Sequence, residues 1–147
     1  MARRVLHDQY FKQAKADGYL ARSAYKLLEI QRRHRLITKS DRVLDLGCAP
    51  GSWLQVASEL IGDSGTLVGI DLKAVRLPEG LVCTTLVGDM TKTEPAVLLE
   101  AAGGAFDVVL SDMAPNTSGH GDDLVSAQLC RTVLGVASAV LRPGGKL

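Results

Sequence analysis

Cysteine, histidine and long apolar runs are all scarce in this chain of 147 residues. Cys48, Cys83 and Cys130 lie far apart and form no C-x-x-C pair, so neither a disulfide framework nor a zinc site is predicted. We interpret the three as small buried side chains in a reducing compartment. The scattered histidines, His7, His34 and His120, show no spacing typical of metal ligands, so no metal is expected.

No run of roughly 18 apolar residues is present that could span a bilayer, and residues 1–10 carry charges where a secretory signal would be apolar. We therefore expect no membrane association and a cytoplasmic location, with the mitochondrion as an alternative. The composition, 46% hydrophobic and 22% charged, is that of one globular domain and excludes collagen, coiled coil and disorder.

The net charge of +1 conceals a basic arm followed by an acidic region. Residues 1–42 contain eleven of the seventeen Lys and Arg residues against four acids, whereas the remainder contains six against twelve. A basic arm favours a polyanionic partner such as nucleic acid, although a solvated helical face explains it equally well. We expect residues 1–41 to form a basic helical arm of the same domain, with residues 42–147 as its core.

Hydrophobic periodicity predicts helices over 8–17 and 22–36, with Lys26 facing away from the core. From residue 42 onward, short apolar runs alternate with helical patterns, which is typical of βαβ units and a parallel sheet. The predicted strands are Arg42–Leu46, Thr66–Asp71, Val82–Val87 and Phe106–Ser111, with helices near 53–61, 94–102 and 123–141. We expect residues 142–145 to form a turn, and a fifth strand only to begin at Lys146, leaving an apolar edge beside the fourth.

The segment from Asp45 to Trp53 follows the first strand and carries two glycines, Gly47 and Gly51. In open α/β sheets the ligand binds at such a strand-to-helix turn, and glycine lets the backbone approach it closely. The segment lacks the Lys-Ser/Thr of a P-loop and is not G-x-G-x-x-G, which disfavours a triphosphate and a dinucleotide. A tight connection without a ligand is the simpler alternative.

An aspartate lies at or near the carboxyl end of each of the four predicted strands: Asp45, Asp71, Asp89 and Asp112. The carboxyl ends of parallel strands share one edge of a sheet, so these carboxylates are expected to line one cleft. An acid after the second strand can accept bonds from ribose hydroxyls, and one after the third can accept from an adenine amine. The pattern favours a nucleoside-containing cofactor, although any single aspartate could instead cap a helix.

The segment from Asp45 to Trp53 and three further stretches resemble the motifs of a known family, the FtsJ (RrmJ) family, in order and spacing. The further stretches are Asp17 to Glu29, Ser111 to Asn116 and Pro143-Gly144-Gly145. Members of this family are S-adenosylmethionine-dependent ribose 2'-O-methyltransferases that act on RNA. The resemblance covers nearly the whole chain and implies a Rossmann-like α/β fold with flanking helices.

The resemblance implies that S-adenosylmethionine lies over the first loop, with its ribose at Asp71, its adenine near Asp89 and its methionine end toward Asp112. The implied cofactor-binding residues are Asp45, Gly47, Ala49, Pro50, Gly51, Ser52, Trp53, Asp71, Leu72, Asp89, Met90 and Asp112.

The resemblance also implies a catalytic set of two lysines, an aspartate and a glutamate. Lys26 matches the first lysine and Asp112 the aspartate. The second lysine and the glutamate are expected beyond Leu147, because Lys146 lies too close to the Pro-Gly-Gly turn. We therefore expect the core to lack its C-terminal strands and the 147-residue form to be inactive if those residues are essential.

The implied function is methyl transfer to a ribose 2'-hydroxyl of RNA, with a uridine of large-subunit (23S-type) ribosomal RNA as the expected target. The expected partner is ribosomal RNA or the large subunit, and a monomer is expected. Two alternatives remain: an inactive RNA-binding or ribosome-assembly module on the same fold, and a nicotinamide-dependent oxidoreductase.

Overall fold

The computed structural model describes residues 12–113 and 122–147. A short helical stretch over 12–16 precedes the main elements. These are α2 (Ala24–His34), β1 (Arg42–Leu46), α3 (Ser52–Ile61), β2 (Thr66–Asp71), β3 (Thr84–Val87), α4 (Pro95–Ala102), β4 (Phe106–Ser111), α5 (Asp122–Val140) and β5 (Leu141–Lys146). The start of the predicted helix over 8–17, together with His7 and His120, lies outside the described residues.

The strands form one parallel sheet in the order β3-β2-β1-β4-β5. β1 lies at the centre, where Val43 pairs with Leu67 of β2 on one side and with Val108 of β4 on the other. The predicted βαβ organisation is confirmed. The strand order reverses at β1 and β4, and such a reversal places a ligand crevice at the carboxyl ends of these strands.

The expectation that the sheet stops at β4 was wrong. The chain passes from α5 directly into β5, which pairs with β4 through Phe106 opposite Leu141 and Val108 opposite Lys146, with an irregular register between them. Pro143 lacks an N–H, which suggested a turn, but the structure accommodates it in an edge strand where the ladder is already interrupted. β5 therefore covers the edge of β4 that was expected to be bare.

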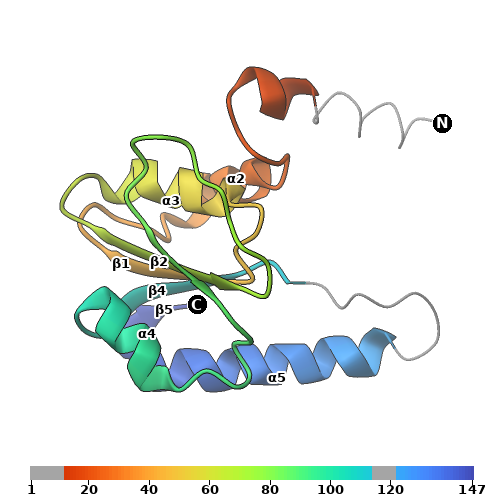
Figure 1. Cartoon of the computed structure of the whole chain (residues 1–147), viewed down its shortest axis with the longest axis vertical. Coiled ribbons are helices and arrows are strands. Elements are labelled where there is room, and N and C mark those ends of the chain that lie inside the picture. Colours follow the sequence, from red (N-terminus) through yellow and green to blue (C-terminus); the bar gives the residue numbers. More distant parts are fainter. Residues whose placement is uncertain (1–11, 114–121) are drawn as a thin grey trace.

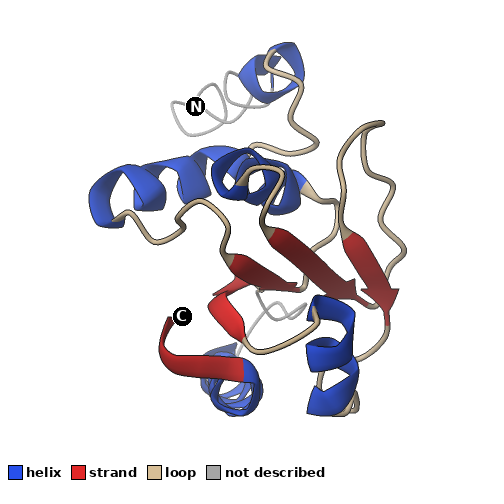
Figure 2. Cartoon of the chain, turned by 90° about the vertical axis from the view of Figure 1, so that its left-hand side faces the viewer, coloured by secondary structure: helices blue, strands red, loops and turns tan. Residues whose placement is uncertain are grey.

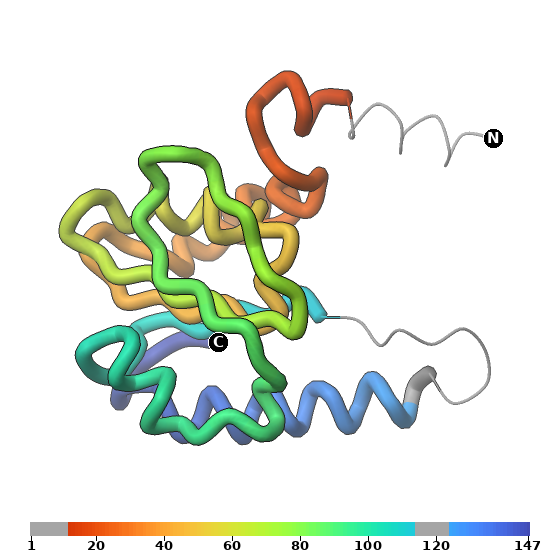
Figure 3. Tube along the Cα trace, viewed as in Figure 1, coloured from red at the N-terminus to blue at the C-terminus, as the bar shows by residue number. Residues whose placement is uncertain are grey.

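Helices cover both faces of the sheet, α2 and α3 on one side and α4 and α5 on the other (Figures 1 and 2). Side chains alternate along β1, so that Val43 packs toward α2 and α3 while Leu44 and Leu46 pack toward α4 and α5. The connection between β2 and β3, residues 72–83, rises alongside α3 (Figure 3) and packs three leucine and valine side chains against that layer. Those side chains are Val75, Leu77 and Leu81.

The cysteine prediction holds in part. All three are free; Cys48 is buried and Cys83 is half-buried, but Cys130 is exposed on α5. Cys130 lies on the same side of α5 as Val133 and Leu134, and all three line an apolar cavity beside β4 that leaves Cys130 accessible. Within the described ranges, no helix is both long and apolar enough to cross a membrane.

Candidate active site

A cleft of about 490 Å³ opens at the carboxyl ends of β1, β2 and β4 and the segment after β3. It is lined by Gly47, Ala49, Ile70, Asp71, Leu72, Lys73, Gly88, Asp89, Met90, Thr91, Asp112, Met113 and Leu129. Seven of the predicted cofactor-binding residues are among these. The cleft therefore brings together the ends of strands that are far apart in the sequence, at the edge where the fold is expected to bind a ligand.

The backbone of the first loop is fixed by bonds to β2. The N–H groups of Gly47 and Cys48 both donate to the carbonyl of Ile70, at 2.8 and 3.1 Å, and the N–H of Ala49 donates to Asp71 Oδ2 at 2.9 Å. Gly47 has φ +75°, and a Cβ there would lie 2.2 Å from Met113 Cγ. Only glycine satisfies both the left-handed backbone and the close approach of Met113.

Asp71 and Asp89 both order the backbone around them. Asp71 Oδ1 accepts the N–H of Lys73 at 2.9 Å, while its Oδ2 binds Ala49, so this carboxylate joins two loops of the cleft. Asp89 Oδ1 accepts both the hydroxyl and the N–H of Thr91, and these bonds lower the pKa of Asp89. Each carboxylate oxygen can accept more than one bond, so both groups keep acceptor capacity toward the cleft.

Asp45 is the most buried acid of the site, with 2% of its surface exposed. It lines a small polar cavity of about 50 Å³ together with Gly47, Ala49, Ser52 and Asp112. Burial raises the pKa of Asp45 well above its ordinary value, and the negative charges of Asp112 and Asp71 raise it further. Neighbouring carboxylates around a cavity of this kind favour a bound cation.

Lys26 and Asp112 meet at the edge of this small cavity. Lys26 Nζ donates to Asp112 Oδ1 at 2.6 Å, although the two residues are 86 positions apart. Their side chains are 62% and 32% exposed, so the pair is accessible from solvent. The prediction that Lys26 faces away from the core is confirmed, and the structure places it against the aspartate with which it was paired in the catalytic set.

The remaining predicted residues of the first loop take different positions. Ser52 and Trp53 line the small cavity, whereas Pro50 is exposed and follows a cis peptide bond. Gly51 is buried, and a Cβ on it would meet Leu77, Val75 and Leu20. Gly51 therefore packs against side chains of other segments of the same molecule, while Gly47 lies in the cleft. Ligand contact by these loop residues stays a prediction.

Gln55 is a residue that sequence reasoning missed. It is 9% exposed on α3, where its side-chain oxygen accepts the N–H of Leu20 at 2.8 Å and its nitrogen donates to the carbonyl of Gly18 at 3.0 Å. A glutamine among the apolar residues of Ser52–Ile61 could have been noticed, because a buried amide requires a hydrogen-bond partner.

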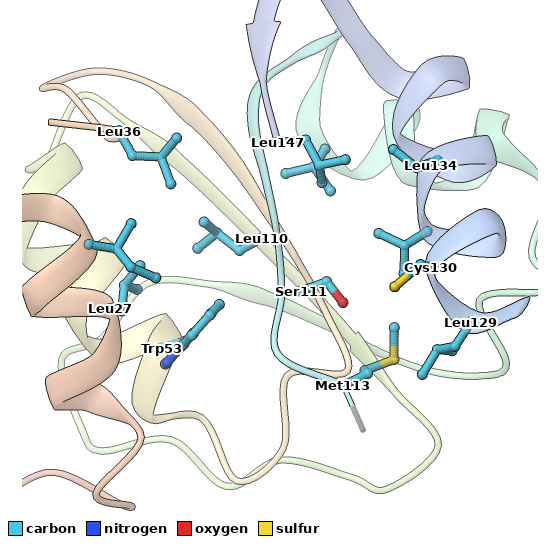
Figure 4. A pocket seen from close by; sticks show the side chains of 13 residues that line it. Leu27, Leu36, Trp53, Leu110, Ser111, Met113, Leu129, Cys130, Leu134 and Leu147 are labelled. Atoms are coloured by element: carbon cyan, nitrogen blue, oxygen red, sulfur yellow. The ribbon is translucent and has the colours of Figure 1, made fainter. Parts of the chain in front are cut away.

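A second, apolar cavity of about 470 Å³ adjoins the cleft and shares Met113 and Leu129 with it. Figure 4 shows leucines from α2, β4, α5 and the chain end around it, with the Ser111 hydroxyl among them. Trp53 contributes its carbon edge, while its nitrogen lies on the side away from α5. The indole therefore separates the apolar cavity from the polar contacts of the first loop.

The parallel sheet, its order reversal and the acid-lined cleft define a Rossmann-like α/β protein of the class that includes S-adenosylmethionine-dependent methyltransferases. Residues 19–147 match the family model described as FtsJ-like methyltransferase. The chain belongs to this family, and the predicted fold class, family and methyltransferase activity class are confirmed.

Two relatives named ribosomal RNA large subunit methyltransferase E illustrate the similarity. The one from Syntrophobacter fumaroxidans is 53% identical over 145 residues, covering 96% of this chain and 73% of that protein. The one from Methanothrix thermoacetophila is 50% identical over 141 residues, covering 94% of this chain and 54% of that protein.

Among solved structures, a ribosomal RNA methyltransferase from Plasmodium falciparum superimposes with a TM-score of 0.77 at 29% identity, covering 86% of this chain and 75% of that one. Fibrillarin from Aeropyrum pernix, solved with S-adenosyl-L-methionine, gives a TM-score of 0.56 at 21% identity over 84% of this chain and 53% of that one. The second likeness bears on the fold alone.

Proposed function

We propose that this chain transfers a methyl group from S-adenosylmethionine to a ribose 2'-hydroxyl of large-subunit (23S-type) ribosomal RNA, with a uridine as target. The observation that carries the proposal is the contact between Lys26 and Asp112 at the edge of the acid-lined cavity. The family and the names of the relatives support the same activity class and substrate class.

The residues of the cleft fit the proposed cofactor. Its amino-acid end carries an ammonium group, which suits the small cavity beside the buried Asp45 and Asp112. Its ribose and adenine suit the remaining acceptor capacity of Asp71 and Asp89, beside Leu72 and Met90. When bound, it supplies an electrophilic methyl group on a sulfonium.

Lys26 and Asp112 are assigned the proton of the attacking hydroxyl. A ribose hydroxyl is a weak acid, so its proton must be removed as the oxygen bonds to the methyl carbon and the carbon–sulfur bond breaks. The pair suits this role because Asp112 Oδ1 lies 2.6 Å from Lys26 Nζ and can stabilise positive charge on that nitrogen. The charge-assisted bond of 2.6 Å also fixes the position of Lys26 Nζ, whereas an unbonded lysine side chain is flexible.

The RNA is assigned to a wide groove of about 780 Å³ beside this pair. The groove is lined by Gln13, Arg22, Ser23, Tyr25, Lys26, Leu28, Glu29 and Arg32. Glu29 accepts from both Arg32 Nη2 and Arg33 Nε, so its negative charge is compensated. Arginines beside an aromatic ring suit phosphates and unstacked bases, and such contacts weaken with salt.

Two further parts of the proposal concern state and place. We expect the chain to act as a monomer, free of membranes, on ribosomal RNA or on the large subunit. We propose a cytoplasmic location, with the mitochondrion as the alternative, because ribosomes are assembled in both.

Two measurements test the proposal. Calorimetric titration with S-adenosylmethionine, with NAD as control, should show binding of the first alone. Labelled methyl groups should then enter ribosomal RNA in alkali-resistant dinucleotides, because a 2'-O-methyl group removes the nucleophile that alkali needs. Binding of NAD instead would favour the oxidoreductase alternative, and binding of S-adenosylmethionine without transfer by any longer form would favour the assembly module.

Single substitutions assign the roles. Lys26→Ala should lower transfer by about 10²-fold or more, the usual contribution of a positioned acid or base, and leave cofactor affinity within twofold. Lys39→Ala removes an equal charge from an exposed position outside the cleft and should leave transfer unchanged. Normal turnover by Lys26→Ala would remove that residue from the mechanism.

A further inference from the structure

The connecting segment, residues 18–23, links the helical stretch 12–16 to α2 and runs beside α3. Lys26 follows it by only three residues, in the first turn of α2. The position of Lys26 Nζ therefore depends on where the connecting segment places the start of that helix. No side-chain bond caps the helix start, because Ser23 makes no capping contact with its own helix.

Gln55 holds the first half of the connecting segment through both ends of its amide. Its oxygen accepts from the N–H of Leu20 and its nitrogen donates to the carbonyl of Gly18, at 2.8 and 3.0 Å. A primary amide that pairs with one carbonyl and one N–H in this way fixes both the position and the orientation of the backbone. The bonds are part-buried, so water competes weakly for them.

The second half is held by residues at the start of α3. Trp53 Nε1 donates to the carbonyl of Ser23 at 2.8 Å, and the hydroxyls of Ser23 and Ser52 are 2.7 Å apart. The Leu20 side chain meanwhile covers Gly51, since a Cβ on that glycine would lie 3.2 Å from Leu20 Cδ1. The same short helix start thus belongs to the cofactor loop and contacts the residue that precedes α2.

We propose that Gln55 and Trp53 are positioning residues for Lys26: by fixing the connecting segment to α3, they hold Lys26 on Asp112 and join the cofactor loop to the proton-accepting pair as one rigid unit. Trp53 then acts through its N–H on the helix start, in addition to any ligand contact. The effect on turnover rests on the proposed function, whereas the effect on the Lys26–Asp112 contact does not.

The chain supplies a matched control at the other end of α2. Gln31 makes the same pair of bonds, its nitrogen donating to the carbonyl of Ile37 at 2.7 Å and its oxygen accepting the N–H of the same residue at 2.9 Å. Gln31→Met and Gln55→Met therefore remove equivalent part-buried contacts. If these glutamines served stability alone, both substitutions would affect Lys26 equally.

The test is trace acetylation of lysine amines, measured by mass spectrometry as the rate at Lys26 relative to exposed Lys39. An ammonium bound to a carboxylate is protected from acylation, so Asp112→Asn gives the fully released rate. We expect Gln55→Met and Trp53→Phe to raise the Lys26 ratio at least threefold toward that value, and Gln31→Met to leave it unchanged. In methyl transfer, Gln55→Met should lower kcat roughly tenfold or more with KM for RNA unchanged, because small misplacements cost large rate factors.

Equal Lys26 ratios in Gln55→Met and Gln31→Met would overturn the inference. If Gln55→Met fails to fold, labelling at Lys26 and Lys39 rises together, and Trp53→Phe decides, since it keeps an aromatic ring and removes one donor. An unchanged ratio in Trp53→Phe would then refute the proposal. Absence of methyl transfer by a longer form would contradict the proposed function and leave the labelling result to decide the positioning role.

Discussion

Substitution of Gly47 by alanine tests how the first loop is built. Two costs are expected. A non-glycine residue at φ +75° costs about 1–2 kcal/mol. The new Cβ, 2.2 Å from Met113 Cγ, forces that side chain from its rotamer at about 0.5–1.5 kcal/mol.

A less flexible unfolded chain returns about 0.4–1 kcal/mol. The net loss in free energy of unfolding is therefore about 0.5–3 kcal/mol, or roughly 1–12 °C in Tm for a chain of this size. Urea unfolding measures the first quantity and calorimetry the second. S-adenosylmethionine affinity should also fall, because Gly47 lines both the cleft and the small cavity.

Two comparisons separate the costs. Gly80 has φ +87° with no atom within 4 Å of a Cβ, so Gly80→Ala carries the backbone cost without the clash. Met113→Ala removes the clashing atoms and leaves a Cβ that would lie at an ordinary 3.7 Å, so it should restore part of the loss when combined with Gly47→Ala. Equal destabilisation by Gly47→Ala and Gly80→Ala, with unchanged cofactor affinity, would refute the assigned role of Gly47.

Three further outcomes are expected. The raised pKa of Asp45 means that the folded chain retains a proton that the unfolded chain releases above about pH 4. The free energy of unfolding should therefore fall as pH rises above that value. Urea melts in which the wild type depends on pH no more than Asp45→Asn would count against this prediction. Burial raises the pKa of Asp107, but the bonds from the Arg42 N–H and from Arg142 lower it overall. The ionised carboxylate therefore stabilises the fold above the pKa that Asp107 has in the unfolded chain, and this stabilisation is lost as pH falls. The difference in unfolding free energy between wild type and Asp107→Asn should vanish below about pH 4, and a difference that persists in acid melts would contradict this. Cys130 is exposed and should react with a thiol reagent in the native state, whereas Cys48 is buried with a pKa raised to about 12 and should react only on unfolding; rapid labelling of Cys48 before unfolding would show that the first loop opens.

Much of the fold could be predicted because its signals are local. The buried strands are short apolar runs with an aspartate at or near the carboxyl end, and Arg42–Leu46 and Thr66–Asp71 have the predicted bounds. β3 begins two residues later than predicted, at Thr84, because Val82 is exposed and pairs with nothing in the sheet. β5 was misjudged because Pro-Gly-Gly is typical of turns, and pairing with β4 overrides that local preference.

The site divides in the same way. The aspartates at strand ends could be assigned to one edge, because parallel strands align their carboxyl ends. The bonds of Gln55 and Trp53 to the connecting segment could not, since they join residues 30 to 37 positions apart through side chains with no spacing pattern. The one signal in the sequence was Gln55 itself, a polar residue in an otherwise largely apolar helix.

The strand order also bears on how the molecule is made. β1 is flanked by β2 and β4. The backbone N–H of Arg42 donates to Asp107, 65 positions later, and Lys26 bonds to Asp112, 86 positions later. Contacts of such sequence separation form late, because loop-closure entropy must be overcome first. During synthesis the glycine loop can therefore form before the carboxylate opposite it exists. The cleft is lined by the first loop and by Asp112 and Met113 after β4. A ligand that contacts both segments, such as the methyl donor, can therefore stabilise only chains in which β4 has already paired with β1.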